Sequence, residues 1–198
     1  MSAGLPIICI CGPSAAGKTT FATALAARLR ELGHRPLRIA CDDYYRSDWL
    51  PHPRFGYDTV DAIDEEVLLR ELRDARCRGL SELRTYDMPS RSVGSKTPDS
   101  FYDLILLEGA YGPQMVLPSI PPTVLVYVQE LLLLRLWRRL RRDVRQRRRS
   151  VAYVIRQMLM EMLPGERAFI HPLRDQATLV IRNQASAVQQ VVSAFDLR

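Results

Sequence analysis

A glycine-bounded segment near the N-terminus constrains this chain more than any other feature. Residues 12–19 have the sequence GPSAAGKT, which fits the pattern GxxxxGK followed by Ser or Thr. An apolar run at 6–11 precedes the segment, and a helical pattern at 18–33 follows it. Glycines let a backbone wrap closely round a phosphate, and successive N–H groups at the start of a helix then donate to its oxygens. This context predicts a binding site for a nucleoside triphosphate.

Two side chains of the segment have specific expected roles. The Lys18 ammonium would reach the β and γ phosphates, and the Thr19 hydroxyl would ligate Mg²⁺. ATP and Mg²⁺ are therefore the expected cofactors. The expected nucleotide contacts in and directly after the segment are Gly12, Ser14, Ala15, Ala16, Gly17, Lys18, Thr19 and Thr20.

Short apolar runs alternate with helical patterns along the rest of the chain. The predicted strands are 6–11, 36–41, 103–107, 123–128 and 178–181. The predicted helices are 18–33, 64–78, 129–144, 151–163 and one near 185–196. Strands that are apolar without interruption suit a sheet that is buried on both faces, and such sheets are parallel with crossover helices. The pattern predicts a three-layer α/β fold with a parallel five-stranded sheet.

The length and composition limit the class of protein. A chain of 198 residues suits one domain, residues 1–198, with a polar excursion at 80–100 that is expected to form a hairpin on the substrate side. The four cysteines lack CxxC spacing, and three lie in apolar runs, which is typical of reduced cysteines in a cytoplasmic protein. No apolar run approaches the ~20 residues of a membrane span, and no basic region precedes the apolar start as in a signal peptide.

Acidic residues follow two predicted strands. Asp42 and Asp43 come after the second strand, and Glu108 comes after the third. Ligands of parallel sheets bind beyond the carboxyl ends of the strands, so these acids should lie beside the phosphate-binding segment. Glu108 would complete the Mg²⁺ site, and Asp42 or Asp43 could accept a proton from an attacking hydroxyl. The alternative for each acid alone is a helix cap or a solvated turn.

The net charge of +6 comes from one segment, because residues 135–149 hold nine arginines and one acid. At ~100° per residue, one helix face carries Leu133, Leu136, Trp137, Leu140 and Val144, and the opposite face carries Arg135, Arg138, Arg139, Arg142 and Arg145. Such a helix could be a solvated surface, a nucleic-acid or membrane patch, or a lid over triphosphate. Its position after the fourth strand favours a lid, spanning 135–163, whose leucine face docks on the protein's own core.

Several motifs together resemble the uridine kinase family of P-loop kinases. GPSAAGKTT resembles its phosphate loop, CDDYYR its D-S-F-Y-R segment, and GYDTVDAID its F-D-H-P-D-A-F-D segment. TYDMPSRSVG resembles its substrate hairpin, LILLEGAYG its acidic strand end, and LLRLWRRLRRDVRQRRR its arginine lid. The motifs occur in the same order over nearly the whole chain.

The resemblance implies ATP-dependent phosphorylation of a small-molecule hydroxyl, with the 5′-hydroxyl of a nucleoside as the expected acceptor. It places the catalytic aspartate on Asp42 and a Mg²⁺ site on Thr19, Asp42 and Glu108. The implied catalytic residues are Asp42, Lys18, Arg138 and Arg142. The implied nucleotide contacts from the lid are Arg138, Arg142, Arg147 and Arg149. The implied substrate contacts are Asp42, Tyr45, Asp58, Tyr86, Glu108 and Gln157.

Departures from the family pattern fall on the side that would recognise the acceptor. The family hairpin carries a histidine beyond its tyrosine, and YDMPSRS lacks one, while a His-Pro pair is replaced by Thr59-Val60. The acceptor could therefore be another small molecule, such as nicotinamide riboside, pantothenate or a sugar phosphate. A different class of function is a non-catalytic nucleotide-binding protein that docks on nucleic acid or membrane. We expect a small-molecule partner, no nucleic acid and no membrane; a homo-oligomer is compatible with the sequence.

Overall fold

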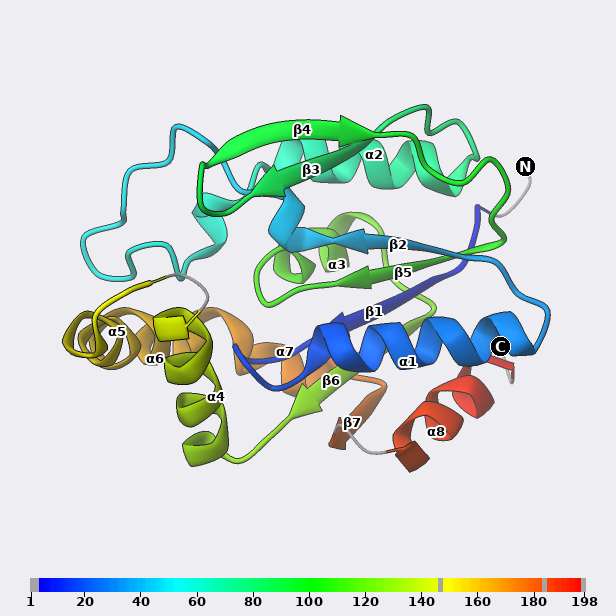
Figure 1. The fold of residues 1–198 in the computed structure, drawn as a ribbon. Coiled ribbons are helices and arrows are strands. Elements are labelled where there is room, and N and C mark those ends of the chain that lie inside the picture. The colour runs from blue at the N-terminus through cyan, green and yellow to red at the C-terminus, as the bar shows by residue number, and fades with distance from the viewer. Residues whose placement is uncertain (1–3, 146–147, 183–184, 197–198) are drawn as a thin grey trace.

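A parallel sheet between two layers of helices positions the site (Figure 1). The computed structural model describes residues 4–145, 148–182 and 185–196. The strands, in spatial order, are β2 (Pro36–Ala40), β5 (Leu104–Glu108), β1 (Ile7–Cys11), β6 (Val124–Gln129) and β7 (Leu179–Arg182). All four pairings are parallel, so the carboxyl ends of the strands share one edge of the sheet. The predicted three-layer α/β fold and its five-stranded sheet are confirmed.

Two apolar cores cover the two faces of the sheet. On one face, α1 (Lys18–Glu31) and α8 (Ala185–Asp196) pack against alternate residues of the central strands, such as Ile8 and Ile10. On the other face, α2 (Glu65–Arg76) and α3 (Pro113–Ser119) pack against Cys9 and Ile105. The sequence patterns predict α1, α2 and α8, but the short α3, which contains Pro118, was not predicted.

The predicted excursion at 80–100 contains an antiparallel hairpin of β3 (Leu83–Asp87) and β4 (Ser92–Lys96). The hairpin lies outside the main sheet, above the end of β2 in Figure 1. A 3₁₀ turn at Cys41–Tyr44 follows β2, and the backbone N–H of Tyr86 donates to Asp43 Oδ1 at 3.1 Å. The hairpin is therefore fastened to the carboxyl edge of the sheet.

Helix α4 (Leu132–Arg145) does not dock as the sequence pattern predicts. We expected its leucine face to bury, but Leu133 is 80% exposed and Trp137 is 55% exposed, whereas Arg135 and Arg139 are buried. Only the remaining part of that face, Leu136, Leu140 and Val144, packs against neighbouring helices. Arg135 and Arg139 of the arginine face are buried because facing elements supply carboxylates that pair with them.

The helix predicted at 151–163 runs further than its pattern indicates. It begins as α5 (Val151–Gln157), widens to a π-helical turn at Met158–Met162 and continues through α6 (Leu163–Gly165). A second π-helical turn at Glu166–Ile170 leads to α7 (Pro172–Gln176). Such turns shift the side chains that follow, and they are frequent at functional sites. Among the described helices, none is long and apolar enough to cross a membrane.

Candidate active site at the carboxyl edge of the sheet

The phosphate loop, residues 12–17, has a backbone shape that requires its glycines. Gly12 has a φ of +137°, and a Cβ at this position would lie 2.3 Å from the carbonyl oxygen of Val128. Gly17 is left-handed, with a φ of 96°, and forms the N-cap of α1. As the N-cap residue, Gly17 contributes no side-chain cap to α1. A helix N-terminus that follows a tight glycine loop fits an anion such as a phosphate group.

The loop lysine is buried and lies among carboxylates. Lys18 Nζ donates to the carbonyl oxygen of Pro13 at 3.0 Å. Burial lowers the pKa of Lys18, while Asp42, Glu108 and Glu166 act in the opposite direction. The nearby carboxylates offset only part of the cost of burying this ammonium, so it is suited to bind the oxygens of a triphosphate.

Two predicted metal ligands meet beside the loop. Thr19 Oγ1 donates to Glu108 Oε2 at 3.2 Å, and Glu108 is buried at the end of β5. Burial raises the pKa of Glu108, Asp42 raises it further, and Lys18 and Thr19 lower it. The strand register places Ala40 and Ile10 on either side of Glu108, which brings the turn after β2 and the loop after β1 to the same carboxylate.

Asp42 is the exposed acid of this group. It lies on the 3₁₀ turn after β2 and influences the pKa of both Lys18 and Glu108. Within the described ranges, no three His, Cys, Asp or Glu side chains are grouped closely enough to hold a metal ion alone. Mg²⁺ binds proteins through one or two oxygens and takes its other ligands from phosphates and water. Thr19 and Glu108, with Asp42 nearby, fit that kind of site.

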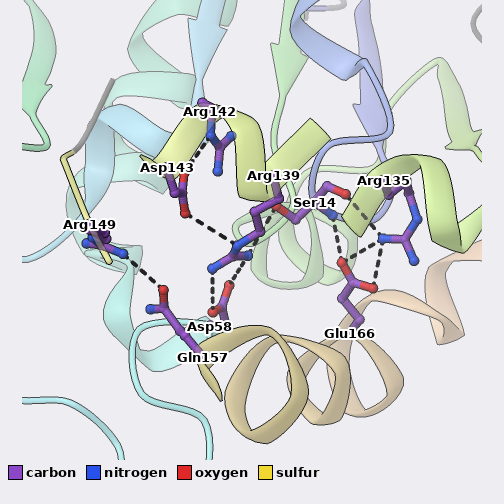
Figure 2. Close-up of polar contacts among 9 residues, drawn as sticks. All are labelled: Ser14, Asp58, Arg135, Arg139, Arg142, Asp143, Arg149, Gln157 and Glu166. Carbon is purple, nitrogen blue, oxygen red and sulfur yellow. Dashed lines mark hydrogen bonds and ion pairs between the residues drawn. The ribbon is translucent and has the colours of Figure 1, made fainter. Parts of the chain in front are cut away.

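A buried carboxylate from the second π-helical turn joins the phosphate loop to α4. Glu166, 1% exposed, accepts a hydrogen bond from the backbone N–H of Ser14 at 2.8 Å. Its two oxygens accept from Arg135 Nη1 at 2.9 Å each, and the same nitrogen donates to the carbonyl oxygen of Ser14 at 3.2 Å. Figure 2 shows this contact at the right of the cluster. The loop, α4 and the π-helical turn are thereby connected.

One arginine connects the loop with a predicted substrate residue. Arg139 donates to both oxygens of Asp58, at 3.2 and 3.1 Å, and to Ser14 Oγ at 3.2 Å (Figure 2). Burial lowers the pKa of Arg139, but the adjacent Asp58 and Asp143 raise it overall. Arg139 therefore stays charged while it is 5% exposed. Asp143, fully buried, lies 3.7 Å from Arg139 Nε.

The lid arginines assigned from the resemblance lie elsewhere. Arg138 pairs with Glu130 at 3.2 Å, and Arg142 pairs with Asp143 at 2.8 Å; both are more than a third exposed. Arg149 donates to Gln157 Oε1 at 2.9 Å, which brings those two predicted residues together. Arg147 lies outside the described residues.

The predicted substrate residues on the other side of the edge are aromatic. The rings of Tyr45 and Tyr86 lie 6.0 Å apart, and both are half-buried. Tyr111, which was not predicted, is buried near Asp58, and burial raises the pKa of its phenol, with Asp58 adding to the effect. Asp64, in contrast, is the N-cap of α2 and accepts from the N–H of Val67 at 3.3 Å.

The sequence analysis placed Arg135 and Arg139 on the arginine face of the lid but did not name them, or Glu166, as site residues. The signal that could have found the two arginines is their spacing with Asp143, since positions four apart form one stripe of a helix. Glu166 offered no such signal, because its place at the loop depends on two π-helical turns.

Comparisons with known proteins agree with this architecture. Residues 7–189 match the model of the phosphoribulokinase / uridine kinase family. The uridine kinase of Staphylococcus epidermidis is 33% identical over 183 residues, 88% of this chain and 86% of that protein. A structure described as a possible uridine kinase from Bacillus stearothermophilus has a TM-score of 0.64 and 19% identity, covering 91% of this chain and 90% of that chain. Phosphoribulokinase from Rhodobacter spheroides has a TM-score of 0.62 and 17% identity, covering 89% of this chain and 69% of that chain. This chain belongs to the phosphoribulokinase / uridine kinase family.

Proposed function

We propose that the protein transfers the γ-phosphoryl group of ATP to a hydroxyl of a nucleoside-like small molecule. One observation carries the proposal: an exposed carboxylate, Asp42, lies beside a buried lysine and beside the buried Glu108, which accepts a hydrogen bond from the exposed Thr19 at the mouth of a phosphate loop. These groups can hold a triphosphate and aim an alcohol at its outer phosphorus.

The donor side of the reaction uses the loop and α1. The backbone N–H groups of residues 15–20 and the Lys18 ammonium would hold the β and γ phosphates. Thr19, Glu108 and Asp42 would hold Mg²⁺, which neutralises charge on the phosphate oxygens when bound. Catalysis of phosphoryl transfer is mostly positioning and electrostatic stabilisation, so a preorganised set of this kind is sufficient.

The acceptor side uses the 3₁₀ turn and the segments that surround it. Asp42 would orient the attacking hydroxyl and accept its proton. Asp58, Tyr45, Tyr86 and Gln157 are the proposed contacts to the rest of the acceptor. The name uridine kinase of the relatives that are about a third identical supports a nucleoside-like acceptor.

Helix α4 would act as a lid whose arginines neutralise phosphate charge and exclude water. The buried Arg135 and Arg139 contact Ser14 of the phosphate loop directly. Arg138, Arg142, Arg147 and Arg149 remain proposed lid residues that would approach the nucleotide on closure. A docking function on nucleic acid or membrane is less well supported, because the paired arginines Arg135 and Arg139 are turned inward.

An Asp42→Asn variant tests the proposal. ADP release would be followed over a panel of nucleosides, vitamins and sugars, and ATP binding would be measured in parallel. We expect turnover of the best acceptor to fall by about 10²–10⁴-fold, the usual contribution of a general base, while ATP binding is retained. Asp48→Asn, an exposed acid on the same segment, is the control. Full turnover by the Asp42→Asn variant would refute the assigned role.

A further inference from the structure

Arg91 reaches from the hairpin turn toward the segment that precedes Asp58. Its Nη2 donates to the carbonyl oxygen of Trp49 at 2.7 Å, and its guanidinium carbon lies 5.4 Å from the centroid of the Tyr57 ring. The residue has a φ of 57°, in the left-handed region that non-glycine residues rarely adopt. A hydrogen bond to the Tyr86 phenol raises the pKa of Arg91, so the group is charged at any working pH.

The surroundings of Arg91 are continuous with the proposed acceptor side. Tyr86 lies between Arg91 and the ring of Tyr45, and its backbone N–H donates to Asp43. Tyr57, under the guanidinium, directly precedes Asp58. Arg91 therefore adjoins two tyrosines, Tyr86, whose backbone contacts Asp43, and Tyr57, which precedes Asp58 in the chain.

Of the described carboxylates, only Asp48 compensates the charge of Arg91, and it raises the pKa of Arg91 from beyond ion-pairing distance. In the part of the chain that the structure describes, no carboxylate lies within ion-pairing distance of Arg91, whereas Arg135, Arg139, Arg142 and Arg84 each have one. The Nε atom of Arg91 is also buried without a hydrogen-bond partner among the described residues. A buried donor on a charged group is costly to leave unpaired.

We propose that Arg91 selects a phosphoryl acceptor that carries a carboxylate or a phosphate group. The inference rests on the proposed function and names the substrate class of the same site. Carboxylate and phosphate oxygens match the planar, fork-shaped donor set of a guanidinium, and the tyrosine rings beside it suit the intervening part of the acceptor. A neutral acceptor would leave the guanidinium without an anionic partner, and a site built around such a contact discriminates strongly against a molecule that lacks it.

Matched pairs of acceptors test the proposal with Mg²⁺ and ATP present. The pairs are orotidine with uridine, pantothenate with its alcohol panthenol, and ribulose 5-phosphate with ribulose; the first two pairs probe carboxylates and the third a phosphate. The variants are Arg91→Gln, Arg91→Lys and the control Arg54→Gln, an exposed arginine on the neighbouring segment that stacks over Phe55. Thermal unfolding of each variant verifies that it is folded.

We expect wild-type kcat/KM to be about 100-fold higher for the charged member of at least one pair. Arg91→Gln should remove this preference mainly through a rise in KM, leaving the neutral member within about threefold. Arg91→Lys should keep part of the preference, and Arg54→Gln all of it. The split between KM and kcat separates recognition from a general loss of structure.

The inference is overturned if neutral members are turned over as well as charged ones, or if Arg91→Gln keeps the preference. If no pair is turned over, the binding of the charged acceptors is measured instead, by titration in the presence of MgADP. The inference is overturned if they bind the wild-type protein no more tightly than the Arg91→Gln variant. Failure of the proposed function has another signature, since ADP release would then be insensitive to Asp42→Asn.

Discussion

The two sides of the active-site edge are held together by different kinds of contact. On the donor side, the phosphate loop and α4 are joined by buried ion pairs, as in the contact of Glu166 with Arg135. On the acceptor side, the hairpin and the segment at 46–57 are joined by half-buried rings and by bonds to backbone atoms, as in the contact of Arg91 with Trp49. A common chemistry needs a fixed donor side, whereas the acceptor side can vary with the substrate.

This difference has an energetic consequence. Removal of one partner from a buried ion pair leaves an uncompensated charge, whereas removal of an exposed contact costs little. Substitutions on the donor side should therefore reduce turnover and stability together. Substitutions in the hairpin and in the segment at 46–57 should change the choice of acceptor and leave the fold intact.

The loop lysine provides the strongest test of the donor side. Lys18→Ala removes the buried ammonium that would hold the phosphates, and we expect kcat to fall by about 10²–10³-fold, as when one transition-state donor is lost. The chain has only two lysines, and the other, Lys96, is exposed on β4. Lys96→Ala is thus a matched control that should retain near wild-type ADP release. Equal losses in both variants would contradict the assignment.

Substitution of two adjacent arginines of α4 compares the contribution of a buried ion pair with that of an exposed one. Arg139→Gln removes the buried ion-pair partner of Asp58, and we expect it to lower the free energy of unfolding by about 3–5 kcal/mol. Arg138→Gln, which breaks the more exposed pair with Glu130, should cost about 1 kcal/mol or less. Urea denaturation measures both. A larger loss in Arg138→Gln would reverse the assignment of the buried face.

The Glu108 carboxylate should lower stability while it serves the site. Because burial raises its pKa, folding favours the protonated form, and the ionised form destabilises the fold as pH rises from the ordinary value of 4.5 through the raised one. Glu108→Gln should be more stable than wild type at pH 7 and equal to it below pH 4.5, with reduced turnover. Denaturation midpoints at the two pH values provide the measurement. A variant less stable than wild type at pH 7 would show that the carboxylate is net stabilising.

The smallest effect is expected on the outer face of α4. Trp137→Gln replaces a ring that is largely exposed, and we expect the free energy of unfolding to change by about 0.5 kcal/mol or less. If this face were docked on the core, as the helical pattern predicts, the same substitution would lower the free energy of unfolding by about 3–5 kcal/mol. The same denaturation series distinguishes the two outcomes.

Short-range patterns of the sequence were sufficient for the fold and for the loop. Uninterrupted apolar strands and the glycine pattern at 12–19 depend on local backbone preferences, and the acids at 42 and 108 follow from the rule that ligands meet parallel strands at their carboxyl ends. The orientation of α4 was not predictable in this way. A hydrophobic helix face is expected to be buried only when the opposite face has no stronger interaction to make. In α4 the opposite face pairs with carboxylates from distant segments, Asp58 and Glu166, and these ion pairs, rather than the leucines, orient the helix.

A structure with Mg²⁺ and a non-hydrolysable ATP analogue would test the shared basis of these proposals most directly. The β and γ phosphates should lie in the loop of residues 12–17, with the metal next to Thr19 and Glu108 and the Asp42 side chain facing the terminal phosphate. An empty loop, or a nucleotide bound with Asp42 and Glu108 turned away from it, would contradict the assignment of this edge as a phosphoryl-transfer site.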